Sequence, residues 1–268
     1  MGARYALAQA TARFAFSATP RLDAELLMAH ALGIERSALL LDLERATPDG
    51  FAALVERRVR HEPVAYIIGS RGFWTIDVAV GPGVLVPRAD SETLIEAAVE
   101  FFGDRAPPRI LDLGTGSGAL LLAALDQWPR ARGVGVDLSE AAIGIASANV
   151  ARLGMDARAT IVRAGWEGHG GPHDLILCNP PYIAEATALP DEVVRHEPAS
   201  ALFAGIDGLD DYRRIAPLLR RQLAPGGVAV IEIGSTQADA VTALLTREGF
   251  AVALRHDLAG RPRALVAT

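Results

Sequence analysis

The tetrapeptide Asn179-Pro180-Pro181-Tyr182 contains the residue types that point most directly to chemistry. It follows an apolar stretch, residues 174–178, that has the composition of a buried strand. Proline restricts its own φ angle and disfavours helical backbone in the residue before it, so this turn is stiff and Asn179 is extended. The side-chain oxygen of Asn179 and a loop carbonyl such as that of Pro180 then form two fixed hydrogen-bond acceptors, and Tyr182 offers a flat face.

Two neighbouring acceptors match the two hydrogens of a planar amino group, either a carboxamide or the exocyclic amine of adenine. The nitrogen of such a group is a weak nucleophile because its lone pair is delocalised. Acceptors at its hydrogens stabilise the positive charge that develops as it attacks an electrophile, and a sulfonium methyl group is a suitable one. The tetrapeptide therefore predicts methyl transfer to a planar nitrogen, with Asn179, Pro180 and Tyr182 as the catalytic residues.

A second candidate site precedes the tetrapeptide. Residues 109–113 predict a strand that leads directly into the glycine-rich run 114–118 (GTGSG) and then into an apolar helix. Glycines permit a tight turn, and a helix N-terminus presents free N–H groups to a ligand. Asp137 ends the next predicted strand, where a carboxylate accepts hydrogen bonds from ribose hydroxyls. The pattern predicts a nucleoside-containing cofactor, and on this loop alone NAD stays possible.

The elements around both sites alternate between strand and helix. Predicted strands are residues 109–113, 133–136, 159–163, 174–178, 227–233, 250–255 and 263–266. Continuous apolar strands suit a sheet that is covered on both faces, so we expect an α/β fold with a doubly wound, mostly parallel seven-stranded sheet. The last two strands are close in sequence and can form an antiparallel edge pair. Ligands bind such sheets at the carboxyl ends of the strands, which brings the two sites together.

The chain before this sheet has a different pattern. Residues 1–72 predict a small all-helical domain, with helices at 22–32, at 37–43 and from Pro48 to 59. Residues 73–88 are rich in β-branched residues, broken by a Gly-Pro-Gly turn at 81–83, and predict a linking β-hairpin. The α/β domain is expected to take residues 89–268.

Composition and charge narrow the function class. The net charge is −6, and all 26 basic residues are arginine, which excludes a lysine nucleophile. A protein that grips duplex DNA through its phosphates shows a basic surface, which this sequence does not predict. The single cysteine, Cys178, excludes an internal disulfide, and the histidines show no metal-ligand spacing. The cysteine and histidine pattern therefore predicts no metal. No apolar run approaches the roughly 18 residues of a membrane span, so a cytoplasmic protein is expected.

Longer stretches around both sites resemble a known family. PPRILDLGTGSGALLLA, GVDLSEAAIGIASANVARLG and HDLILCNPPYI are similar to class I S-adenosylmethionine-dependent methyltransferases that modify planar nitrogens. HEPVAYIIGSRGFW, VLVPRADSETL, HEPASALFAGIDGLDDYRRI, VIEIGSTQ and DLAGRPR narrow the resemblance to the protein-(glutamine-N5) methyltransferases of peptide chain release factors. One departure is Ala89, which stands where the family has a proline and is expected to change loop stiffness more than chemistry.

The resemblance implies a methyltransferase sheet, S-adenosylmethionine as the methyl donor with S-adenosylhomocysteine as product, and no metal. The substrate would be the glutamine of the Gly-Gly-Gln motif in a release factor, held in a pocket of Asn179, Pro180, Pro181 and Tyr182. The helical domain 1–72 would help to dock that partner; we expect a monomer that binds neither membranes nor nucleic acid directly. The cofactor-binding residues that the resemblance implies are Gly114, Thr115, Gly116, Ser117, Gly118, Asp137, Trp166 and Asn179.

Other functions stay open at this point. An adenine-N6 DNA methyltransferase shares the logic of the tetrapeptide but needs a basic cleft and a unit that reads a flipped base. A glutamine of a ribosomal protein is an alternative substrate. An NAD-dependent oxidoreductase would leave the tetrapeptide without a role, and a non-catalytic binding module would not need an intact pocket.

Overall fold

The computed structural model describes residues 2–268, and the chain forms two compact units. The first comprises the chain up to Ser70 together with Leu189–His196; the second comprises Arg71–Ala188 and Glu197–Thr268. Among the described residues, no helix is both long enough and apolar enough to cross a membrane.

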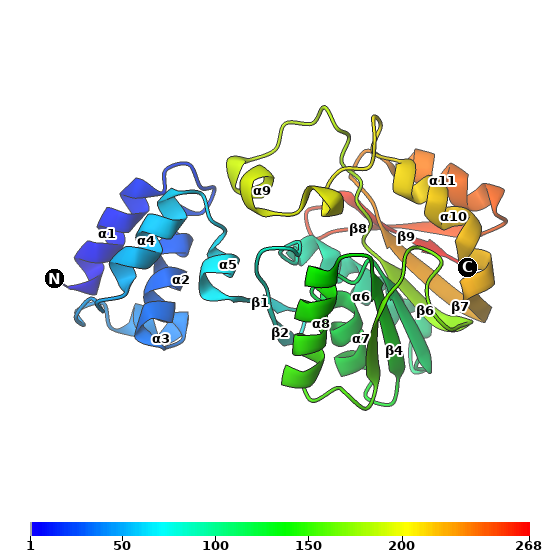
Figure 1. Ribbon diagram of the computed structural model, residues 1–268, viewed down its shortest axis with the longest axis horizontal. Helices are drawn as coiled ribbons and strands as arrows, with labels where there is room; N and C mark the ends of the chain where they lie inside the picture. The colour runs from blue at the N-terminus through cyan, green and yellow to red at the C-terminus, as the bar shows by residue number, and fades with distance from the viewer. Residues whose placement is uncertain (1) are drawn as a thin grey trace. The chain divides into compact units, whose positions relative to one another are not determined.

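The first unit is helical (Figure 1). Its core is built from apolar side chains that include Leu7, Phe14, Leu27 and Met28, all fully buried. The last of its six helices comes from a distant part of the sequence, and an ion pair of 2.7 Å between Arg58 and Glu192 ties it to the rest of the unit. The helices are α1 (Ala3–Arg13), α2 (Pro20–Leu32), α3 (Arg36–Leu41), α4 (Phe51–Val59), α5 (Val64–Ile68) and α9 (Asp191–His196).

The second unit contains the predicted seven-stranded sheet. Its strands are β3 (Arg109–Leu113), β4 (Arg132–Asp137), β5 (Ala159–Arg163), β6 (His173–Cys178), β7 (Leu223–Glu232), β8 (Val252–His256) and β9 (Pro262–Ala267). They lie in the order β5-β4-β3-β6-β7-β9-β8, with β3 to β7 parallel and β9 antiparallel to both of its neighbours. The doubly wound, mostly parallel sheet and its antiparallel edge pair are thus confirmed. Strand order reverses between β3 and β6, so their carboxyl ends flank the expected ligand position.

Helices cover both faces of this sheet, which explains why its strands are continuously apolar (Figure 1). Helices α10 (Asp210–Gln222) and α11 (Ala238–Arg247) pack on the face that carries Leu111 and Leu113. Helices α6 (Glu92–Phe102), α7 (Ala119–Gln127) and α8 (Glu140–Arg152) pack on the other face. The second unit also has two short 3₁₀ turns, η1 (Ala89–Ser91) and η2 (Ala199–Ala201).

The β-hairpin is present but lies earlier in the chain than expected. Its strands are β1 (Ser70–Phe73) and β2 (Ile76–Ala79), which two residues connect. Residues 80–88 form no strand. The two prolines in this stretch, Pro82 and Pro87, have no N–H to donate to a neighbouring strand. The segment therefore forms a loop and does not extend the hairpin.

Candidate functional site

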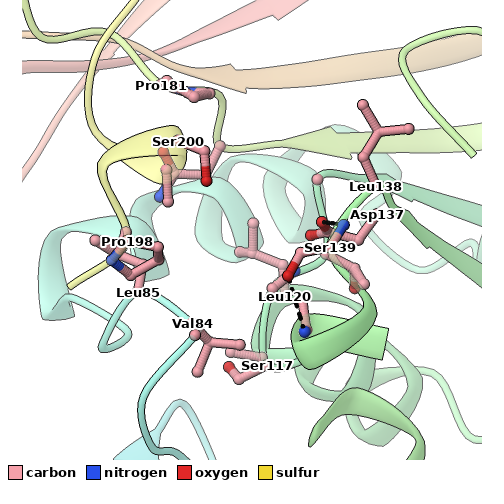
Figure 2. Close-up of a pocket in the computed structure, with 18 of the residues that line it drawn as sticks. Val84, Leu85, Ser117, Leu120, Asp137, Leu138, Ser139, Pro181, Pro198 and Ser200 are labelled. Carbon is pink, nitrogen blue, oxygen red and sulfur yellow. Dashed lines mark hydrogen bonds between the residues drawn. The ribbon is translucent and has the colours of Figure 1, made fainter. Parts of the chain in front are cut away.

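One cavity of the second unit gathers most of the predicted site residues (Figure 2). The glycine-rich loop after β3, the end of β4 and the tetrapeptide after β6 all contribute to it. Figure 2 shows Asp137 and Ser139 on the wall that faces Pro198 and Ser200. The predicted residues that line this cavity are Gly114, Thr115, Gly116, Ser117, Asp137, Trp166, Asn179 and Pro181, whereas Gly118, Pro180 and Tyr182 are not part of its lining.

The glycine-rich loop curls back on itself before α7 begins. Gly114, Gly116 and Gly118 have φ angles of 70°, 55° and 83°, a region that residues with a side chain rarely adopt. The amide of Thr115 donates to the carbonyl of Val136 at 2.9 Å, which anchors the loop to β4. A Cβ atom added at Gly116 would meet nothing within 4 Å, so the backbone there is open to a ligand.

Asp112 holds this loop from beneath, a role that the residue pattern did not single out. It is 1% exposed, and its Oδ2 accepts from the Thr115 hydroxyl at 2.6 Å and from the amide of Leu121 at 3.3 Å. An acidic residue within a buried apolar strand is the signal that marks it, because such a group needs partners. Burial raises the pKa of Asp112 to about 7, against the hydrogen bonds from Thr115 and Leu121, which lower it.

The carboxylate of Asp137 is fixed by backbone amides and faces the cavity. Its Oδ2 accepts from the amide of Gly116 at 3.0 Å, and its Oδ1 accepts from the amide of Ser139 at 2.9 Å (Figure 2). Each carboxylate oxygen has a second acceptor position, so both can still receive a ligand hydroxyl. The neighbouring Leu138 lines the same cavity and is 67% exposed, which leaves an apolar surface beside these acceptors.

Asn179 presents one end of its amide to the protein and lines the cavity. Its Nδ2 donates to the hydroxyl of Ser91 at 3.2 Å. Within residues 2–268 no group donates to its Oδ1, which is therefore available as an acceptor. Pro180 is buried, and Pro181 lines the cavity beside Asn179. This half of the tetrapeptide thus combines a stiff backbone with an open acceptor.

Tyr182 takes a different direction from Asn179. It lines a second cavity, together with residues such as Gly234 and Gln237. Its hydroxyl donates to Oε1 of Glu232 at 3.2 Å, and burial raises the pKa of Tyr182 well above its usual value. The phenol is therefore held as a neutral hydrogen-bond donor toward Glu232.

The wall opposite Asp137 depends on a buried carboxylate. Glu197 is 5% exposed; its Oε1 pairs with Arg88 at 2.6 Å, and its Oε2 accepts from the amide of Val86 at 3.2 Å. The next residues, Pro198 and Ser200, line the cavity. The contacts of Glu197 with Arg88 and Val86 therefore fix the start of the segment that forms this wall.

Cys178 is buried, and burial raises the pKa of its thiol well above the usual value, which disfavours a thiolate nucleophile. No group of three or more His, Cys, Asp or Glu side chains in the described part of the chain is placed to hold a metal ion.

Stability should fall as the pH rises through 7, because Asp112 keeps its proton to about that pH in the folded chain. An unfolded Asp ionises near pH 3.9, so the folded state binds more protons up to about pH 7 and loses this advantage above it. Urea unfolding from about pH 6.5 to pH 8 measures this slope in a range above the lowered pKa of His173. Asp112→Asn should make the dependence of stability on pH less steep. A wild-type stability that rises from pH 6.5 to pH 8 would contradict the raised pKa of Asp112.

Gly118 tests the backbone of the loop. Gly118→Ala should destabilise the protein by about 1–2 kcal/mol, because Gly118 has a φ of 83° and an added Cβ would lie 3.1 Å from Leu122. Gly144→Ala is the matched control: this exposed glycine of α8 has open space at its Cβ, so the change should stabilise by about 0.5–1 kcal/mol. Urea unfolding of both variants measures the change in the free energy of unfolding, which should fall for Gly118→Ala and rise for Gly144→Ala. Equal changes would refute the assignment of strain to Gly118.

Comparison with known proteins identifies the family to which this chain is similar. Residues 5–69 match the PrmC N-terminal domain, and residues 90–198 match the Methyltransferase small domain. A protein of Rhodospirillum rubrum named release factor glutamine methyltransferase is 44% identical over 256 residues, which cover 92% of this chain and 78% of the relative. A protein of Mycolicibacterium smegmatis with the same name is 40% identical over 277 residues, with 99% and 97% covered.

Solved structures support the fold alone. A methyltransferase from Pyrococcus furiosus is similar with a TM-score of 0.53 and 16% identity, over 72% of this chain and 88% of that one. The catalytic domain of hMettl16 has a TM-score of 0.58 and 15% identity, over 82% and 81%. Because relatives above 40% identity span nearly the whole chain and carry one name, this chain belongs to the release factor glutamine methyltransferase family.

Proposed function

We propose that this protein transfers the methyl group of S-adenosylmethionine to the side-chain amide nitrogen, N5, of the glutamine in the Gly-Gly-Gln motif of a peptide chain release factor. The observation that carries the proposal is the open Oδ1 of Asn179, in the same cavity as the glycine-rich loop and Asp137. The names of the relatives, release factor glutamine methyltransferase, support the substrate.

The residues of the cavity fit a nucleoside. Asp137 has two acceptor oxygens for ribose hydroxyls, and Gly116 leaves space for close approach. Leu138 and Trp166 supply apolar surface for a planar base. When bound, S-adenosylmethionine supplies an electrophilic methyl group on a positively charged sulfur.

Asn179 and the turn after it orient the substrate amide. The Asn179 Oδ1 and the carbonyl of Pro180 would each accept one hydrogen of the glutamine –NH₂ group. Held in this way, the nitrogen would be directed at the methyl group of a bound donor, and the acceptors would stabilise the positive charge that grows on it. The N–C bond would form as the C–S bond breaks, which leaves S-adenosylhomocysteine, and the nitrogen would lose one proton to water. The positions of the two acceptors are fixed before the reaction, because the prolines restrict the turn and Ser91 holds the Asn179 amide.

The helical first unit would dock the release factor. Its surface exposes large apolar side chains, with Leu41 90% and Leu40 42% exposed at the end of α3. Such residues suit contact with a protein partner more than with nucleic acid. We propose that the enzyme acts as a monomer on this protein substrate, with no direct contact to nucleic acid or membrane.

Labelled S-adenosylmethionine tests the substrate class. The purified protein is incubated with a release factor, with double-stranded DNA or with ribosomal proteins, and the label in each macromolecule is counted. The proposal expects label in the release factor alone. Label in DNA would support an adenine methyltransferase instead, and label in a ribosomal protein would move the target glutamine there.

A further inference from the structure

We propose that Glu232 is a positioning residue that acts through Ser91 on Asn179, so that the amide oxygen of Asn179, and not its nitrogen, faces the cavity. The inference rests on the proposed function and adds to it a residue that does not touch the substrate. It concerns the direction of a hydrogen-bond chain that runs from β7 to the tetrapeptide.

The chain of contacts is buried at its inner end. Glu232 is the last residue of β7 and is 1% exposed, and Ser91, at the end of η1, is 3% exposed. The Ser91 hydroxyl accepts from Asn179 Nδ2 at 3.2 Å, and it acts on the carboxyl of Glu232, whose pKa it lowers. Oε2 of Glu232 is buried, and no group among residues 2–268 donates a hydrogen bond of good geometry to it. A buried carboxylate oxygen needs a donor, so the Ser91 hydroxyl proton is expected to turn toward it.

The direction of this chain decides which end of the Asn179 amide faces the cavity. An ionised carboxylate can only accept hydrogen bonds, so the single proton of the Ser91 hydroxyl turns toward Glu232. The Ser91 oxygen is then left as an acceptor and selects the NH₂ end of Asn179. The oxygen end of Asn179 therefore faces the cavity, where the substrate amide needs an acceptor. Without this direction, the two ends of the amide are nearly equal in shape and can exchange.

Glu232 holds the other end of the tetrapeptide as well. Tyr182 donates its hydroxyl proton to Oε1 of Glu232 at 3.2 Å. One buried carboxylate therefore contacts Tyr182 directly and Asn179 through Ser91. This arrangement gives Tyr182 a role in fixing the turn.

Protonation of Glu232 would remove the fixed donor-to-acceptor direction of the hydrogen-bond chain. Burial raises the pKa of Glu232 to about 7; the Ser91 hydroxyl, the charge of Arg263 and the Tyr182 hydroxyl lower it, and the charge of Asp90 raises it. A protonated Glu232 can donate to Ser91, which is then free to donate to Asn179. The active form is the carboxylate, so kcat should rise with pH through about 7. Besides Tyr182 itself, the titratable and charged groups that act on Glu232 or Tyr182 are Arg263, Asp90, Tyr212, Cys178 and Arg88. Asp257 pairs with Arg263 at 3.2 Å.

Glu232→Gln tests the proposal, because glutamine has nearly the same shape but can donate as well as accept. At saturating cofactor and release factor, kcat should fall about tenfold, the low end for loss of a hydrogen bond to a charged group. KM for the release factor should stay unchanged, since Glu232 does not touch it. The rise of kcat through pH 7 should disappear. Asp112 supports the glycine-rich loop through Thr115, so its titration should change cofactor affinity. At saturating cofactor, the pH dependence of kcat therefore reports on Glu232 and not on Asp112.

Two further variants act as controls. Ser91→Ala breaks the chain in its middle, so Glu232→Gln added to it should lower kcat no further. Tyr212→Phe removes a hydroxyl that donates to the backbone carbonyl of Glu232 at 2.9 Å, and it should keep the wild-type kcat and pH profile. Thermal unfolding confirms that each variant is folded, and Ser91→Ala carries the test if Glu232→Gln is not.

The proposal fails if Glu232→Gln retains the wild-type kcat and pH profile. It also fails if the effects of the two substitutions multiply in the double variant, because independent effects mean that no chain connects the residues. A wild-type enzyme that leaves release factors unmethylated would instead overturn the proposed function.

Discussion

Asn179→Ala should lower kcat on a release factor by at least about a hundredfold, the effect of removing one preorganised polar group from a reacting centre. The substitution removes the acceptor that the proposed mechanism places at the substrate amide, and it leaves the Ser91 hydroxyl without its donor. The backbone should persist because Pro180 and Pro181 still restrict it.

Single-turnover kinetics with saturating cofactor measure this loss at the chemical step. A thermal melt identifies a variant that is merely unfolded. Asn179→Asp gives a useful contrast: it keeps an acceptor at the cavity but cannot donate to Ser91, so it should also be impaired. Turnover of Asn179→Ala at the wild-type rate would refute the role assigned to this side chain.

Asp137→Ala should weaken cofactor affinity about 10- to 100-fold, since hydrogen bonds to a charged group contribute about 1.5–3 kcal/mol. The carboxylate accepts from the amides of Gly116 and Ser139, and the proposal adds ribose hydroxyls as further donors. Its removal costs the ligand contacts and loosens the glycine-rich loop.

Calorimetry with S-adenosylhomocysteine measures this affinity. Asp156→Ala is a matched control, because it makes the same charge change at an exposed residue after α8 and should leave the affinity unchanged. Asp137→Asn, which keeps one acceptor oxygen, should lie between Asp137→Ala and the wild type. Equal affinities for Asp137→Ala and the wild type would count against a ribose at this carboxylate.

Much of the second unit follows from local sequence. The strand predicted at 109–113 has the bounds of β3, and the strand predicted at 159–163 has those of β5. Strands that are buried on both faces leave unbroken apolar runs, and glycines and prolines mark the turns between them. The glycine-rich loop and Asn179 could be placed in one cavity because both follow strands that end at the same edge of the sheet.

Contacts between residues far apart in sequence could not be predicted in this way. Asn179 meets Ser91 across 88 residues, and Tyr182 meets Glu232 across 50. Arg58 is 2% exposed and pairs with Glu192, 134 residues away, although a run of arginines on a helix usually faces solvent. Such pairs depend on how elements pack, and neither periodicity nor spacing encodes that. The hydroxyl of Tyr182 therefore has a partner that the flat-face interpretation did not include.

Mass spectrometry of a release factor, incubated with S-adenosylmethionine in the presence or absence of this protein, tests the central claim most directly. Methyl transfer to an amide nitrogen should add the mass of one methylene group, and fragmentation should locate it on the glutamine of the Gly-Gly-Gln motif. An unchanged mass, or a methyl group on any other residue, would contradict the account.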